Sequence, residues 1–97
     1  MYIIRFSKQA DKDKKLLKGV GLVSKAKKLL DIIAENPFQN PPPYEGLVGN
    51  LSGYYSRRIN IQHRLVYQIY NDPVIIDGVE YQGTIKIIRM WTHYDKI

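Results

Sequence analysis

The sequence predicts an α+β fold in which an N-terminal strand and a two-helix hairpin pack on a twisted, mainly antiparallel sheet. The first observation is a short β-rich segment at residues 2–6. The second is a pair of segments with helical periodicity, separated by Gly19-Val20-Gly21. The third is a change to strand-like periodicity after a proline-rich connection at 37–43. The length suits one domain, so we expect residues 1–97 to form a single domain.

The first helix is predicted at residues 8–18. Ser7 is suited to cap it, because a serine oxygen can accept from a free backbone N–H in the first turn. Asp11 and Asp13 place negative charge in the early turns, where the helix dipole favours it. Leu16 and Leu17 are its clearest apolar contacts.

The second helix is predicted at residues 22–35 and ends before Asn36-Pro37, because proline disfavours helical geometry in the residue before it. Its lysines lie mostly away from its apolar residues. The predicted core stripe is Leu22, Ala26, Leu29, Leu30 and Ile33. We expect the two helices to form an antiparallel hairpin on the sheet and segment 37–43 to be a positioning loop.

Four strands are predicted in the second half. A short one lies around Leu47, and longer ones cover residues 54–59, 64–70 and 84–91. Asp77-Gly78 is typical of a type I′ hairpin turn.

That turn predicts which residues face each other across the hairpin. Ile76 would face Val79, Tyr67 would face Ile88, and Arg64 would face Trp91. The predicted chemical face carries Arg64, Trp91 and His93, and the predicted core face carries Leu65, Tyr67, Ile69, Ile88 and Met90. A single bulge, at Pro73 or Gly83, would destroy this alternation, whereas two bulges would preserve it.

The face taken by Arg58 depends on the preceding hairpin. A two-residue turn at Ile61-Gln62 would place Arg58 opposite Leu65, away from Arg64. A three-residue loop or a bulge would bring Arg58 onto the Arg64 face, and Arg57 takes whichever face Arg58 leaves. Both alternatives remain open at this point.

The net charge is +6, and most of the excess lies in the helical half, where residues 1–40 hold nine basic and four acidic residues. Such a surface attracts polyanions, although lysines also serve as solvated helix faces. The absence of cysteine excludes disulfides and thiolate zinc sites, and fits a reducing cytoplasm. His63 and His93 are poorly spaced for a metal, no phosphate-binding glycine loop is present, and no stretch could span a membrane. We expect neither a cofactor nor a metal.

Three residues together suit RNA cleavage without a metal. Glu45 and His93 supply a carboxylate and an imidazole for proton transfer, and Arg64 supplies a guanidinium for the charge on phosphate. Tyr94 would orient the phosphate or support the acid, and the aromatic candidates for stacking on bases are Tyr44, Tyr54, Tyr55 and Trp91. Each residue also has an ordinary structural interpretation, and His63 is assigned to the turn.

The second half resembles the YoeB/Txe toxins of the RelE superfamily. The resemblance is carried by four blocks: Asn50-Leu51-Ser52-Gly53, Ser56-Arg57-Arg58-Ile59, His63-Arg64-Leu65-Val66-Tyr67 and His93-Tyr94. It differs in Gly46, where the family often has proline, in Val48, where it often has a basic residue, and in a longer 74–83 region. The chain also continues past Tyr94 as Asp95-Lys96-Ile97.

The resemblance implies a RelE-like toxin of a type II toxin–antitoxin system, an endoribonuclease that cuts mRNA in the ribosomal A site. It implies Glu45 as general base, His93 as general acid, Arg64 and Arg58 on the phosphate, and Tyr94 completing the site. An acidic antitoxin of YefM/Phd type and a toxin homodimer are the implied protein partners. The alternatives are an inactive RelE-like module that binds RNA or antitoxin, and a general ribonuclease that cuts naked RNA.

Overall fold

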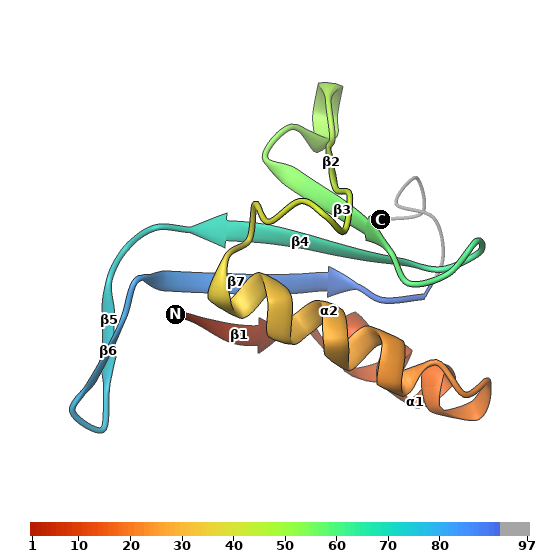
Figure 1. The fold of residues 1–97 in the computed structure, drawn as a ribbon, viewed down its shortest axis with the longest axis horizontal. Helices are drawn as coiled ribbons and strands as arrows, with labels where there is room; N and C mark the ends of the chain where they lie inside the picture. The colour runs from red at the N-terminus through yellow and green to blue at the C-terminus, as the bar shows by residue number, and fades with distance from the viewer. Residues whose placement is uncertain (92–97) are drawn as a thin grey trace.

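The computed structural model describes residues 1–91 as a two-layer arrangement, with α1 and α2 covering one side of a five-stranded sheet (Figure 1). Its strand order is β1-β7-β4-β3-β2, and β5 and β6 form a separate hairpin that extends away from it. The bounds are β1 Tyr2–Phe6, α1 Lys8–Gly19, α2 Val23–Glu35, β2 Glu45–Gly46, β3 Tyr54–Arg58, β4 Arg64–Tyr70, β5 Val74–Ile76, β6 Val79–Tyr81 and β7 Gly83–Arg89, with a 3-10 turn at Gly49–Leu51.

The sheet is mainly antiparallel, as expected. β1 runs parallel to β7, from Tyr2 opposite Gly83 to Phe6 opposite Ile87. The pairs β2–β3, β3–β4 and β4–β7 are antiparallel. Strand β1 therefore lies at one edge of the sheet, paired with β7.

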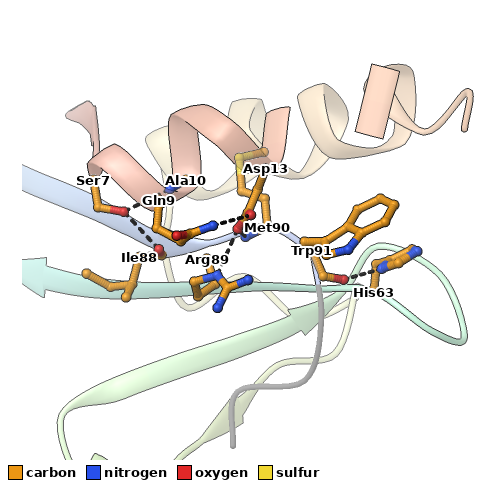
Figure 2. Close-up of polar contacts among 9 residues, drawn as sticks. All are labelled: Ser7, Gln9, Ala10, Asp13, His63, Ile88, Arg89, Met90 and Trp91. Carbon is orange, nitrogen blue, oxygen red and sulfur yellow. Dashed lines mark hydrogen bonds and ion pairs between the residues drawn. The ribbon is translucent and has the colours of Figure 1, made fainter. Parts of the chain in front are cut away.

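Helix α1 is joined to β7 at two points, both drawn in Figure 2. Ser7 caps the helix by accepting from Ala10 N at 3.0 Å, and its hydroxyl donates to Ile88 O at 2.8 Å. Asp13 is fully buried, and its Oδ2 accepts from Arg89 Nε and from Met90 N, both at 2.9 Å. The expected acidic residue of an early turn is thus also an anchor between helix and sheet.

The core lies between the helices and the sheet. Of the expected stripe on α2, Ala26, Leu29 and Ile33 are buried and the other two are partly buried. On α1 Leu17 is buried, but Leu16 is 46% exposed, so its expected core contact is wrong. The sheet contributes Leu65, Tyr67, Ile85, Ile87 and Met90.

The expected type I′ turn is confirmed, because Asp77 and Gly78 have φ of 49° and 78° and Ile76 faces Val79. The pairing predicted farther along is wrong, since Tyr67 faces Ile87 instead of Ile88. Three residues separate β4 from β5, whereas one separates β6 from β7. Gly83 has no partner on β4, so three residues on one side and two on the other separate the pair Val74–Tyr81 from the pair Tyr70–Thr84, and the β4–β7 pairing moves by one residue.

A second irregularity, between Val66 and Tyr67, restores the original register, so that Val66 faces Arg89. Ile88 is the extra residue there and is only half-buried, which corrects its expected core position, while Met90 beyond it is buried as expected. The first shift in register occurs where β6 passes into β7. Glycine is required there at position 83, because a Cβ would lie 2.0 Å from Tyr70 O.

The strand expected around Leu47 lies slightly earlier, at Glu45–Gly46. Leu47 follows it as a buried residue, and its N donates to Tyr54 O at 2.9 Å. The correction matters because it places Glu45 in the sheet, beside β3.

Candidate active site

A hollow of about 170 Å³ lies where β2, β3 and β4 meet the end of the proline-rich segment. The residues that line it are Pro42, Pro43, Tyr44, Glu45, Ser56, Arg58 and Arg64. Three of the five residues predicted for catalysis, Glu45, Arg58 and Arg64, are therefore brought together. The other two, His93 and Tyr94, lie outside the described residues.

The β3–β4 hairpin resolves the face of Arg58. Ile59 N donates to His63 O at 2.9 Å across a loop of three residues, 60–62. Arg58 consequently lies directly opposite Arg64, and Arg57 lies opposite Leu65 on the core side. Of the two alternatives left open by the sequence, the structure has the one that places both Arg58 and Arg64 on the site face.

The two arginines form a concentrated positive site. In a pair of this non-hydrogen-bonded type the Cα atoms lie only about 4.5 Å apart, so the side chains start close together. Like charges directly opposite each other destabilise a sheet. A bound anion between the two guanidinium groups would relieve that repulsion, and a phosphate matches their donor geometry.

Glu45 supplies the carboxylate of the site. It pairs with Ser56 across β2 and β3, which places its side chain on the same face as Arg58 and Arg64. Glu45 is exposed and forms no ion pair with any residue of 1–91. Its carboxylate is therefore available to accept a proton or a hydrogen bond from a ligand.

Arg57 fixes the loop that leads into the site. It is 1% exposed, and its Nη2 donates to Pro37 O at 3.0 Å and to Gln39 O at 2.9 Å. Its Nη1 donates to Pro42 O at 2.6 Å and its Nε to Tyr67 OH at 3.0 Å. The expected positioning loop is thus held by a buried arginine. The sequence predicted only that Arg57 and Arg58 lie on opposite faces, and it did not indicate that Arg57 holds the loop.

Tyr67 completes this buried network by donating its hydroxyl to Pro37 O at 3.1 Å. Burial raises the pKa of Tyr67, and the hydrogen bond and positive charge of Arg57 oppose that rise. The phenol therefore stays protonated and keeps its donor role at neutral pH.

The aromatic candidates divide into packing and open positions. Tyr55 packs against Phe38 and Tyr44, with ring centroids 5.4 and 6.2 Å apart, and stacks on Tyr67 at 5.9 Å. Trp91 stacks on His63 at 4.0 Å, and His63 Nδ1 is hydrogen-bonded to Trp91 O (Figure 2). His63 is 4% exposed, in agreement with its structural assignment. Tyr44 remains at the wall of the hollow.

The described geometry combines a proton acceptor with an anion clamp. Glu45 can take a proton, and Arg58 with Arg64 can stabilise charge that develops on a phosphate.

Neither helix in residues 1–91 has the length and apolar character that a membrane-spanning helix requires.

Comparison with known proteins identifies the family. Residues 6–94 match the family described as the YoeB-like toxin of bacterial type II toxin–antitoxin systems. A Toxin YoeB from Synechocystis is 50% identical over 64 residues, which cover 66% of this chain and 67% of that protein.

Two solved structures from Staphylococcus aureus share the fold over nearly all of both chains. A YoeB dimer is 38% identical with a TM-score of 0.72, covering 96% of this chain and 98% of that one. The toxin of a heterotetrameric YoeB–YefM complex is 37% identical with a TM-score of 0.70, covering 97% and 99%. The family match spans both the helical layer and the residues of the hollow, and the chain belongs to the YoeB-like toxins of bacterial type II toxin–antitoxin systems.

Proposed function

We propose that this toxin is an endoribonuclease that cuts mRNA in the ribosomal A site and so stops translation. The observation that carries the proposal is the hollow that holds Glu45 beside the opposed pair Arg58 and Arg64. The carboxylate can accept the proton of a 2′-hydroxyl, and the two guanidinium groups can bind the phosphodiester beside that hydroxyl. The catalytic roles of His93 and Tyr94 are proposed from the family resemblance, because these two residues match the family's pattern in the sequence.

The proposed reaction uses the nucleophile that RNA carries. Glu45 takes the proton of the 2′-hydroxyl while the 2′-oxygen forms a bond to phosphorus, and the bond from phosphorus to the 5′-oxygen breaks. His93 donates a proton to that leaving oxygen, and Tyr94 supports the transfer. Arg64, assisted by Arg58, stabilises the additional negative charge on the phosphate oxygens. The products are a 2′,3′-cyclic phosphate and a 5′-hydroxyl.

The test is to map cut positions on translating ribosomes for the parent chain and for Glu45→Ala. We expect cuts in the A-site codon for the parent and a loss of about 100-fold or more for the variant. Glu80→Ala is the matched control, because Glu80 is an exposed carboxylate on β6, outside the residues that line the hollow. Unchanged cutting by Glu45→Ala would exclude Glu45 as the base. Equal cutting of naked RNA would instead indicate a general ribonuclease.

We further propose that an acidic antitoxin of YefM/Phd type restrains the toxin in the cytoplasm. An apolar groove of about 540 Å³ lies between α1 and α2, and lysines surround it. The apolar residues that line it are Leu17, Val23, Ala26, Leu30 and Met90, and the charged residues are Lys14, Lys15, Lys18, Lys27 and one carboxylate, Asp11, which pairs with Lys14. An amphipathic segment with carboxylates beside its apolar face matches both features.

Charge reversal tests this partner. The triple variant Lys15→Glu, Lys18→Glu and Lys27→Glu is expected to weaken antitoxin binding by about 100-fold, because like charges repel across a docked surface. Its matched control is Lys8→Glu, Lys12→Glu and Lys25→Glu, since these lysines are not among the groove residues. Equal affinity of the two triple variants would place the antitoxin elsewhere.

We also propose that the free toxin forms a homodimer, and sedimentation of the free toxin tests this.

A further inference from the structure

Ser56 lines the hollow and has no part in the proposed reaction so far. It is in the middle of β3, opposite Glu45 on β2 and Val66 on β4. The alternation of β3 places its side chain on the site face, between the positions of Tyr54 and Arg58. The Ser56 side chain also lines the hollow together with Glu45.

The Ser56 hydroxyl is buried without a partner. Ser56 is 1% exposed, and within residues 1–91 its Oγ is the one buried side-chain nitrogen or oxygen that lacks a hydrogen bond. The large majority of buried side-chain polar atoms in proteins have a hydrogen-bond partner, and an exception in a site requires an explanation. The neighbouring Arg57, by contrast, uses its Nε, Nη1 and Nη2 in four hydrogen bonds.

The Glu45 carboxylate is the acceptor best placed for this hydroxyl. The hydrogen bond from Leu47 N to Tyr54 O lies two residues along the same ladder, so Glu45 and Ser56 form a pair with Cα atoms about 5.5 Å apart. Side chains at directly opposed positions point to the same face. Rotation of the glutamate and serine side chains can bring a carboxylate oxygen within hydrogen-bond distance of Oγ.

We infer that Ser56 is a positioning residue for Glu45, an inference that rests on the proposed nuclease function. When RNA fills the hollow and displaces water, Oγ donates to one carboxylate oxygen and leaves the other to accept the 2′-hydroxyl proton. The other charged or titratable side chains of the hollow are Tyr44, Arg58 and Arg64. By holding the carboxylate on the β2 side, Ser56 keeps it from pairing with the guanidinium groups that the phosphate requires.

The experiment measures single-turnover cleavage of mRNA on programmed ribosomes across a range of pH for Ser56→Ala. We expect the maximal single-turnover rate constant to fall about tenfold, with the half-saturating toxin concentration unchanged, because the carboxylate is held less often in its productive orientation. The acidic limb of the rate profile is expected to move to higher pH, since a donor that favours the charged carboxylate is lost. Thermal unfolding is expected at the same or a higher temperature, because the variant removes an unpartnered hydroxyl.

Ser52→Ala is the matched control, since Ser52 is an exposed serine in the turn before β3, and we expect parental cleavage from it. Ser56→Thr retains the hydroxyl and is expected to recover the parental pH profile. Parental rate and profile in Ser56→Ala would overturn the inference, as would a lower rate with an unchanged profile and lower stability. If the parent cuts and Glu45→Ala cuts equally well, the inference fails while nuclease activity stands. No cutting by the parent overturns both.

Discussion

Arg57 and Arg58 are adjacent in sequence and differ in almost every structural respect. Arg57 points to the core side, is 1% exposed, and donates to Tyr67 OH and three carbonyl oxygens. Arg58 is exposed, lies opposite Arg64 and lines the hollow. The same side chain therefore stabilises a loop at one position and forms part of a candidate anion site at the next. Strand register, and not residue type, separates the two roles.

The difference also explains how the site is held. Arg57 has its donors satisfied by the protein, so it fixes residues 37–42 in one arrangement. That loop runs directly into Tyr44 and Glu45. A rigid support behind the sheet thus orients the polar groups in front of it. The following variants test this division, from the largest expected effect to the smallest.

Arg57→Met is expected to lower the free energy of unfolding by about 3 kcal/mol or more, because several buried acceptors lose their donor. The matched variant Arg58→Met is expected to change it by no more than about 0.5 kcal/mol, as is usual for surface positions. Urea denaturation of both variants measures the comparison. Equal midpoints would show that the Arg57 network is not the support described above.

Arg58→Ala is expected to slow cleavage on ribosomes about 100-fold, which corresponds to about 2.7 kcal/mol of transition-state stabilisation. Its stability should remain parental, since the side chain is exposed. Arg58→Lys should recover part of the rate, because it retains the charge but not the planar fork. A parental rate for Arg58→Ala would remove Arg58 from the site and leave the clamp to Arg64.

Tyr67→Phe is expected to cost about 1–2 kcal/mol of stability, because Arg57 Nε and Pro37 O lose their contacts with the phenolic oxygen. Tyr70→Phe is the control, since Tyr70 is an exposed residue whose hydroxyl bonds Gln68. Denaturant midpoints measure both. The expectation fails if the two phenylalanine variants are equally stable.

The smallest expected effect is the dependence of stability on alkaline pH. Burial raises the pKa of Tyr67 above its ordinary value of 10.0, so the folded chain holds this proton more tightly than the unfolded chain. The contribution is complete below the ordinary value and is lost as pH rises through the folded pKa. Tyr67→Phe should therefore show a shallower loss of stability above pH 10.0 than the parent. Parallel curves would contradict the assignment.

Local patterns were sufficient to predict much of the fold. The Ser7 cap, the stripe on α2, its end before Asn36 and the Asp77-Gly78 turn each depend on neighbours close in sequence. The pairing of Tyr67 with Ile87 could not be predicted, because it depends on how unequal connections between β4 and β7 are absorbed in three dimensions. Leu16 was misplaced because helix α1 turns Leu17 toward the core, and the preceding position then lies toward solvent.

For the site, residue types predicted which groups take part, but not how they are supported. Glu45, Arg58 and Arg64 were predicted from chemistry and from family blocks, and they line one hollow. The network of Arg57 with the proline-rich loop spans 10 to 20 residues of sequence, and no local pattern marks it. Ser56 belongs to one of the family blocks, but nothing in the sequence assigned it a role, because an unpartnered hydroxyl is visible only when its surroundings are known.

The place of β7 in the sheet has a consequence for the synthesis of the chain. β7 pairs with both β1 and β4, so the five-stranded sheet is not complete until β7 joins it. A nascent chain that has not yet added β7 leaves β1 without its partner, and it leaves unpaired the edge of β4 opposite the one that pairs with β3. The five-stranded sheet that positions the hollow is therefore assembled only after the residues of β7, Gly83–Arg89, have emerged from the ribosome.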